Sequence, residues 1–201
     1  MMNASSNPQQ TDLASVTLAP GFRLPFFPMR PRLGQRIKTV DDVTRIFEEE
    51  TDYDFTLKLN GDRACLAVLD GDAYAQNRHG DWYKMTIDNL DRFKSLAGAW
   101  LFDGEIYKKK FLPFEAIIVA GQSIAKRCPT YRKSVAMEVS SSLKIDWAYG
   151  HGIDDVLAMA SKWIGNTNPV IEGVVGKRKG SSYVPMGSST QQSCQWLKHK
   201  W

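Results

Sequence analysis

The chain of 201 residues is 43% hydrophobic and 11% aromatic, so it can build one substantial core and is not a disordered tail. Its net charge of +4 permits a polyanionic partner without demanding one. The three cysteines are far apart, no run of about 18 apolar residues is present, and the N-terminus lacks signal-peptide features. These features argue against a disulfide framework, a membrane span and secretion, and we expect a cytoplasmic protein.

The first 21 residues are expected to form a flexible leader. Met1 to Pro20 is rich in Asn, Ser, Gln and Thr, with few large apolar side chains to offset the entropy of ordering. Residues 22–201 are expected to form one domain. Within it, Phe22 to Leu33 is proline-rich and predicts extended chain over a core, whereas Thr39 to Asp42 has the form of a capping box that starts a helix through Glu50.

A period-two pattern from Phe55 to Val68 predicts strand. Apolar side chains such as Leu57 alternate there with polar ones, so Lys58 faces away from the apolar side. The run then turns at Asp70-Gly71, a hairpin signal, and returns through residues 73–77. This order is typical of an antiparallel meander.

The remainder of the chain alternates between short helices and strands. Helices are predicted at Asp88–Ala97, Tyr131–Ser141 and Asp154–Ile164, and strands at Trp100–Tyr107, Phe114–Ala120, Val170–Lys177 and Gln195–Trp201. Strands interleaved with a few helices indicate an α+β fold of antiparallel β-sheets flanked by helices.

Lys58 is the candidate covalent nucleophile. A lysine at its ordinary pKa of about 10.4 is a poor nucleophile, so this role needs desolvation or nearby positive charge to favour the neutral amine. Lys198 and Lys200 share a predicted strand face and can supply that charge or hold nucleotide phosphates. Gly61 lets a ligand approach the backbone closely, and Arg63 can reach a ribose or phosphate. Taken alone, Lys58 is better explained as a solvent-facing strand lysine.

The candidate acids lie on two predicted strands. Asp103 and Glu105 share one strand face, an arrangement suited to a sugar hydroxyl or a hydrated magnesium ion. Glu172 offers a second carboxylate of the same kind, although each acid alone is also explained as a surface acid. Glu172 and Lys177 are five residues apart, so a regular strand would direct their side chains to opposite faces. Either a glycine between them introduces a bulge, or only one of the two enters the site.

Six motifs in this order resemble those of the covalent nucleotidyltransferases, the family of ATP-dependent DNA ligases, RNA ligases and messenger-RNA capping enzymes. They are Lys58-Leu59-Asn60-Gly61-Asp62-Arg63, Arg78-His79-Gly80, Asp103-Gly104-Glu105, Phe114-Glu115, Glu172-Gly173-Val174-Val175-Gly176-Lys177 and Lys198-His199-Lys200. The position of Arg63 and the closing Trp196-Leu197-Lys198 make the chain most similar to bacterial and phage ATP-dependent DNA ligases.

The resemblance implies a fold and an activity. The fold would be the nucleotidyltransferase (ATP-grasp-like) adenylation domain, with the nucleotide cleft between its sheets. Lys58 would attack the α-phosphate of ATP with Mg²⁺, or alternatively Mn²⁺, as a charge screen, and would become adenylated. The AMP would pass to a 5′-phosphate at a nick in duplex DNA, where the adjacent 3′-hydroxyl would displace it and seal the strand.

The resemblance also implies roles for the site residues. Those expected to hold the nucleotide are Leu57, Arg63, Arg78, Glu105, Phe114, Lys177, Lys198 and Lys200, with Phe114 stacked on adenine and the last two lysines on the α-phosphate. Glu105 and Glu172 are the expected metal ligands.

Two departures from the family pattern stand out. Asn60 stands where aspartate is commonest, and the oligonucleotide-binding (OB) domain that follows the last motif in family members is missing from this sequence. A separate OB domain or subunit is therefore an expected partner, and the chain is an excised domain, half of a split enzyme or a naturally minimal protein. Two alternatives stay open: an RNA ligase or capping-type enzyme, and a catalytically idle module that binds nucleic-acid ends.

Overall fold

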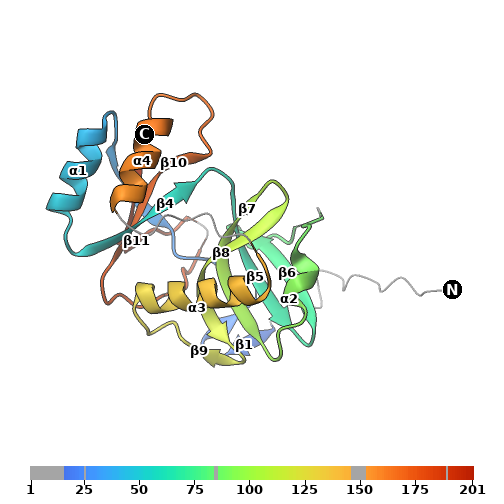
Figure 1. The fold of residues 1–201 in the computed structure, drawn as a ribbon. Coiled ribbons are helices and arrows are strands. Elements are labelled where there is room, and N and C mark those ends of the chain that lie inside the picture. Colours follow the sequence, from blue (N-terminus) through green and yellow to red (C-terminus); the bar gives the residue numbers. More distant parts are fainter. Residues whose placement is uncertain (1–15, 25, 84–85, 146–152, 189) are drawn as a thin grey trace.

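Two larger β-sheets, with helices packed against them, and one small two-stranded sheet make up the fold (Figure 1). The structure, a computed structural model, describes residues 16–24, 26–83, 86–145, 153–188 and 190–201. The four-stranded sheet has the order β3 (Pro31–Arg36), β11 (Ser193–Lys200), β10 (Ile171–Arg178) and β4 (Tyr53–Leu59). The five-stranded sheet has the order β6 (Asp72–Asn77), β5 (Asp62–Leu69), β7 (Trp100–Tyr107), β8 (Lys110–Val119) and β9 (Gln122–Ser123).

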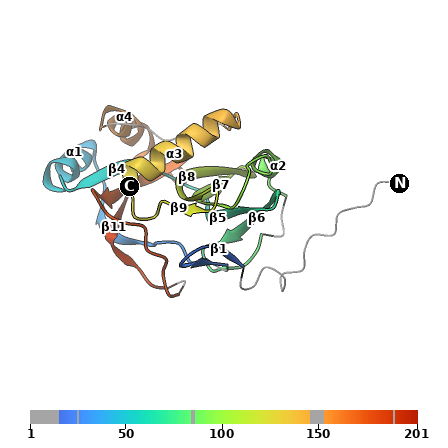
Figure 2. The ribbon, with the colours of Figure 1, turned by 90° about the horizontal axis from the view of Figure 1, so that it is seen from below.

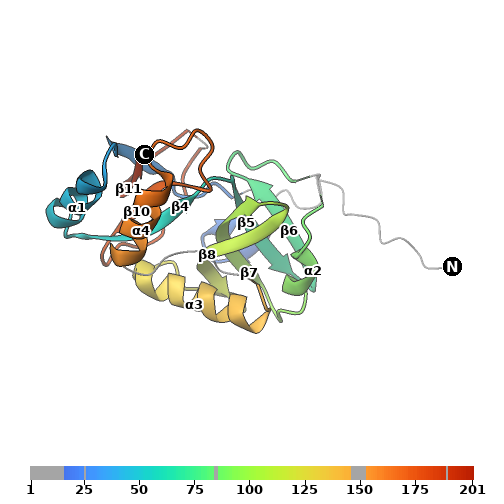
Figure 3. The same ribbon diagram turned by 45° about the horizontal axis from the view of Figure 1, so that its top comes forward.

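Helices cover parts of both sheets. They are α1 (Val40–Glu49), α2 (Leu90–Phe93), α3 (Pro129–Ser142) and α4 (Ile153–Trp163). Helices α1 and α4 contact each other and α4 contacts β10, whereas α3 lies along β8 (Figure 2). Figure 3 shows α2 at the other end of the molecule from α1, where it contacts β6. Among the described residues, no helix combines the length and the apolar character needed to cross a membrane.

The core lies on both faces of the five-stranded sheet. On one face of β5, Ala64, Leu66 and Val68 pack into a cluster shared with β4 and with helices α1, α3 and α4. On the other face, Cys65 and Ala67 pack toward the small sheet of β1 (Thr17–Ala19) and β2 (Phe22–Arg23). Because β5 is buried on both sides, its sequence is a nearly continuous apolar run.

Two predictions that rest on local sequence, the capping box and the hairpin turn, are confirmed. The Thr39 hydroxyl accepts the Asp42 N–H at 3.2 Å and the Asp42 carboxylate accepts the Thr39 N–H at 3.0 Å, so the capping box opens α1 as predicted. At the predicted hairpin, Asp70 and Gly71 both adopt positive φ, 52° and 82°, and join β5 to β6.

The prediction of one run from Phe55 to Val68 is wrong. The run breaks at Asn60-Gly61, so that β4 and β5 belong to different sheets. Two further differences concern pairing: β3 runs parallel to β11 although antiparallel sheets were expected, and Thr17–Ala19 pairs with β2 although residues 1–21 were predicted as a leader. Leu18 and Ala19 are buried, and that burial stabilises the pairing; residues 1–15 lie outside the described part of the chain.

The helix predicted at Asp88–Ala97 is reduced to the four residues of α2. Backbone hydrogen bonds between residues 87 and 96 mostly span three residues rather than four, for example from Leu90 N to Ile87 O. The Asn89 side chain is committed to β8, since it donates to Phe111 O at 2.8 Å and accepts from Phe111 N at 2.9 Å. This tie to a strand takes the place of a helix cap.

Gly61 stands at the crossing between the sheets because nothing larger fits. A Cβ at this position would lie 2.5 Å from the Ile106 carbonyl oxygen and 2.9 Å from Glu105 Cγ, both on β7. The turn is held on its other side by Asn60, which donates its backbone N–H to Val170 O at 2.9 Å and its side-chain amide to Pro169 O at 3.0 Å. The crossing is therefore tight and fixed in register.

We expect Gly61→Ala to lower the free energy of unfolding by about 1–3 kcal/mol, because the added methyl group overpacks a backbone contact. Urea denaturation followed by circular dichroism measures this loss. The matched control is Gly71→Asn, at a positive-φ turn where a Cβ meets nothing within 4 Å. Asn tolerates that conformation and should cost less than about 0.5 kcal/mol. Equal losses in the two variants would contradict the packing argument.

Candidate active site

A cleft between the two sheets brings together most of the residues predicted to bind a nucleotide. Its lining includes the predicted residues Leu57, Lys58, Arg63, Glu105, Phe114 and Lys177. Residues that the motifs did not assign also line it: Pro31, Thr56, Leu59, Val175 and Trp196. Arg78 is not among the lining residues; it is exposed and its guanidinium donates to His79 at 3.1 Å.

Lys58 reaches the cleft from β4 because the strand alternates as predicted. Leu57 and Leu59 are buried, and Lys58 projects to the opposite face. Across from Lys58 on β10, the register shifts between Ile171 and Gly173, where φ of Gly173 is 153°. With this bulge Glu172 bonds Lys58, a lining residue of the cleft, and Lys177, five residues later, lines the cleft itself.

Glu172 is shared between two of the predicted lysines. One carboxylate oxygen pairs with Lys58 Nζ, and the other accepts from Lys200 Nζ at 2.7 Å. Partial burial acts to raise the pKa of Glu172, but hydrogen bonds from Lys200 and Lys58 outweigh it and lower this pKa. The cluster therefore holds two cations on one carboxylate, at the edge of the cleft.

Lys198 adds positive charge to the same region. Burial lowers the pKa of Lys198, and the charges of Lys58, Lys200 and Arg30 lower it further. Cations that repel one another at close range favour an anion, such as a phosphate, as their common ligand.

Glu105 projects from β7 into the cleft and is 7% exposed. Burial raises the pKa of Glu105 to about 7, although Lys58 and Arg63 oppose the shift. With a pKa raised toward neutrality, the Glu105 carboxyl is accessible in its protonated form, in which it can donate as well as accept a hydrogen bond.

Asp103, two residues before Glu105 on β7, is bound by side chains of the protein itself and does not face the cleft. Its carboxylate accepts from Arg63 Nε at 3.0 Å and from the Tyr183 hydroxyl at 2.6 Å, and it is fully buried. Burial acts to lower the pKa of Arg63, but Asp103 outweighs it and raises this pKa. The expectation that Asp103 and Glu105 both face a sugar or metal is therefore wrong for Asp103, which positions Arg63.

Lys177 is held in the cleft by a second buried acid, Glu115. Glu115 accepts from Lys177 Nζ at 2.7 Å and from Arg132 Nε at 3.1 Å, and all three side chains are almost inaccessible. The Lys177 ammonium also lies 4.7 Å from the ring centre of Phe114 and 4.4 Å from that of Trp196. Burial lowers the pKa of Lys177 against the opposing effect of Glu115.

Glu115 and Trp196 stand in the quoted segments Phe114-Glu115 and Trp196-Leu197-Lys198, but sequence reasoning gave neither of them a role in the site. A carboxylate inside the apolar run of residues 114–120 was the available signal for Glu115, because a buried acid requires a partner. For Trp196 the segment Trp196-Leu197-Lys198 was noted, but nothing in it indicated that the indole lines the cleft. It enters the cleft because it pairs in register with Lys177 across β10 and β11.

The described residues fit a magnesium ion only together with a ligand. No group of three or more His, Cys, Asp or Glu side chains among them is arranged to hold a metal. Mg²⁺ usually keeps several waters and binds through one or two carboxylates plus substrate phosphates. Glu172 fits that role once phosphates draw Lys58 or Lys200 away, and Glu105 fits it in its ionised form.

The raised pKa of Glu105 predicts a pH dependence of stability. From its ordinary value of 4.5 up to about 7, the folded protein keeps a proton that the unfolded chain has released, so rising pH favours unfolding in this window. Relative to Glu105→Gln, the wild-type free energy of unfolding should fall by roughly 2–3 kcal/mol across it. Urea denaturation of both proteins at several pH values measures the difference, and parallel curves would contradict the assignment.

Comparisons with known proteins place the fold. The sequence matches no protein-family model and no curated protein. The structure is similar to a mycobacterial DNA ligase D complexed with ATP and MES, with a TM-score of 0.59 and 16% identity, over 87% of this chain and 60% of that one. It is also similar to the ligase domain of LigD from M. tuberculosis, with a TM-score of 0.61 and 17% identity, over 87% of this chain and 59% of that one.

A third solved structure, Pmar-Lig_PreS3, has a TM-score of 0.57 and 14% identity, over 90% of this chain and 48% of that one. The predicted fold class is therefore confirmed: mostly antiparallel sheets and flanking helices are arranged as in these DNA ligase structures. This chain spans 60% or less of each of these neighbours.

Proposed function

We propose that this chain is the adenylation domain of an ATP-dependent DNA ligase and that Lys58 is its covalent nucleophile. The observation that carries the proposal is the cluster of Lys58, Glu172 and Lys200 at the edge of a cleft whose walls hold Glu105 and Phe114. Mere binding of nucleic acid would not require two lysines, Lys58 and Lys200, that share one carboxylate beside a cleft. The shared fold supports the proposal.

The proposed reaction has three displacements at phosphorus. The neutral Lys58 Nζ attacks the α-phosphorus of ATP, an N–P bond forms, the bond to the β-phosphate oxygen breaks and pyrophosphate leaves. The oxygen of a DNA 5′-phosphate then attacks the same phosphorus and releases Lys58. Finally a 3′-hydroxyl attacks the activated 5′-phosphate, AMP leaves and the strand is sealed.

The positions of the side chains suggest how each would assist. Lys200 and Lys198 balance the charge that develops on the α-phosphate, and Glu105 bonds a ribose hydroxyl beside Arg63. The Phe114 ring would stack on adenine. Lys177 lines the same side of the cleft, with its ammonium against this ring. Arg78, outside the cleft, is left as a contact for a more distant phosphate.

Before Lys58 attacks, its ammonium has to lose a proton, and Glu172 is the carboxylate bonded to it. Mg²⁺ or Mn²⁺, held by Glu172 and Glu105 with the phosphates, would screen the charge of the triphosphate. A nicked DNA duplex, a separate OB domain and a cytoplasmic location complete the proposal; the last is supported by the free thiols of Cys65, Cys128 and Cys194.

We expect the wild-type protein to retain label from ATP labelled at the α-phosphate, in the presence of Mg²⁺, after denaturing electrophoresis. Lys58→Ala should abolish the label, because no other amine lies in the same position. The matched control is Lys162→Ala, on the surface of α4, which should label like wild type. Absence of label from wild type at every pH and metal concentration would contradict the proposed covalent step.

The nucleic-acid substrate is tested separately with nicked DNA, nicked RNA and pre-adenylated nicks. Sealing of the DNA nick is the expected outcome. Labelling by GTP instead of ATP would favour a capping-type enzyme, and sealing of RNA alone would favour an RNA ligase. Tight binding of nicks without any label would favour an idle end-binding module.

A further inference from the structure

A groove runs from the Lys58–Glu172 contact along the edge strand β3. One wall is formed by residues 33–38 and the other by Asn60, residues 164–167 and Pro169, while Glu172, Lys200 and Trp201 also line it. We call it the β3 groove. It is distinct from the nucleotide cleft, whose lining residues it does not share, and it meets that cleft at Glu172, which bonds Lys58.

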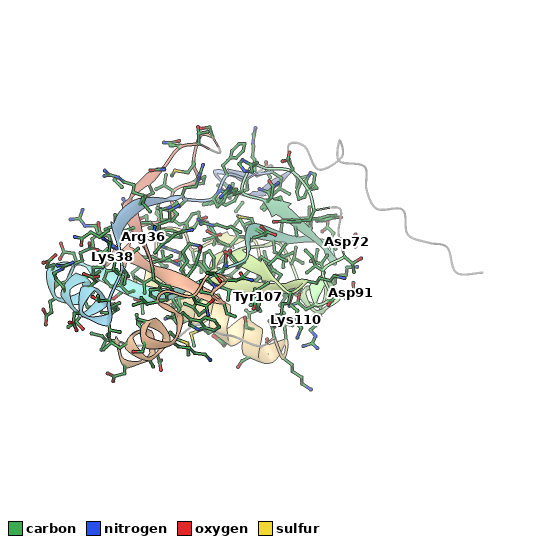
Figure 4. The ribbon with its side chains drawn as sticks, turned by 90° about the horizontal axis from the view of Figure 1, so that it is seen from above. Arg36, Lys38, Asp72, Asp91, Tyr107 and Lys110 are labelled. Atoms are coloured by element: carbon green, nitrogen blue, oxygen red, sulfur yellow. The ribbon has the colours of Figure 1, made fainter. Side chains whose placement is uncertain are left out.

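The β3 groove carries positive charge that the described part of the chain does not neutralise. Arg36 and Lys38 are exposed and form no ion pair with any carboxylate among the described residues. Both lie beside Lys200, since Arg36 pairs with it in register and the Ile37 N–H donates to Lys200 O at 2.7 Å. Figure 4 shows Arg36 and Lys38 close together, at the opposite end of the molecule from Asp72 and Asp91.

Two acids near the β3 groove, Glu172 and Asp42, are already engaged. Among the described residues that line it, Glu172 is the one acid, and both of its oxygens are taken by Lys58 and Lys200. Asp42 on α1 accepts the backbone N–H of Lys38 at 2.9 Å and pairs with Arg45 at 2.8 Å. The two exposed cations are therefore available to an external polyanion.

Apolar surface accompanies this charge. Leu33, on the edge strand, is 68% exposed and lies in register with Lys198. The Trp201 indole N–H donates to Ile171 O at 2.6 Å, which fixes the orientation of its ring. A row of cations beside an aromatic ring and an apolar side chain is the combination that binds a nucleic-acid strand, through its phosphates and its stacked bases. A free phosphate or pyrophosphate would use only the cations.

We propose that the β3 groove binds the polynucleotide strand whose terminal phosphate is directed toward Lys58. Arg36 and Lys38 contact successive backbone phosphates, and a base or sugar packs on Trp201 and Leu33. The assignment of the strand end rests on the proposed function, whereas binding of a strand in the groove does not. It explains why two unneutralised cations stand next to the Lys58–Glu172–Lys200 cluster.

The test compares Arg36→Ala/Lys38→Ala with the control Lys126→Ala/Arg127→Ala, which removes the same two charges from exposed positions after β9. The probe is a fluorescent, 5′-phosphorylated nicked DNA duplex, and its dissociation constant is measured by anisotropy without ATP between about 50 and 200 mM salt. Loss of two phosphate contacts should reduce the slope of log affinity against log salt by about 1.4 to 1.8. The control should keep the wild-type slope.

The contribution of the apolar part of the β3 groove is measured by a different substitution, which changes affinity but not its salt dependence. Trp201→Leu keeps apolar bulk at the site but removes the stacking face, so affinity for the nicked duplex should fall about 10-fold with the salt slope unchanged. Thermal unfolding of each variant shows that the fold is retained.

The outcomes separate this assignment from the proposed reaction. A wild-type salt slope in Arg36→Ala/Lys38→Ala would overturn the groove assignment, and so would a loss of ATP labelling in this variant with unchanged DNA affinity, which would assign the cations to the triphosphate. A reduced slope in a protein that ATP never labels would support the groove while refuting the proposed covalent step.

Discussion

The geometry of the site depends on the tight crossing at Asn60-Gly61, where the chain leaves one sheet and enters the other. Gly61 touches the backbone of β7, and Asn60 is tied to residues 169 and 170 by two hydrogen bonds. Because the crossing is so short, the end of β4 and the start of β5 face the same cleft. Lys58 and Arg63 therefore approach one ligand from two sheets, without a flexible loop between them.

The charged groups of the site fall into two kinds that differ in burial. Asp103 and Glu115 are fully buried and hold Arg63 and Lys177 against the aromatic wall of the cleft. Breaking such buried pairs is costly, so these cations are fixed in place before a ligand arrives. Glu172 is different: it is partly exposed and shared between two lysines, so its ion pairs are weaker than the buried ones, and under the proposed function they would give way to phosphates.

Sequence reasoning succeeded where the deciding contacts are local. The capping box at Thr39, the Asp70-Gly71 hairpin and the alternation that exposes Lys58 each depend on residues a few positions apart. It failed where partners are distant in sequence. Asn89 bonds β8 and so shortens α2, and β3 gains its parallel partner more than 160 positions later. Neither arrangement leaves a periodic signal in the segment itself.

For the site, the motifs singled out Lys58, Glu105, Glu172 and Lys200, and the structure brings them near one another, with Lys58 and Lys200 on Glu172 and with Lys58 and Glu105 in one cleft. The motifs did not establish which acid serves a ligand and which serves the protein. Asp103 and Glu105 look equivalent in sequence, yet only Glu105 faces the cleft, since cross-strand neighbours and Tyr183 capture Asp103. Likewise the bulge beside Gly173, which brings Glu172 to Lys58, forms only when β10 pairs with β4. Long-range pairing decides these points because the direction of a side chain is set by its register against a neighbouring strand.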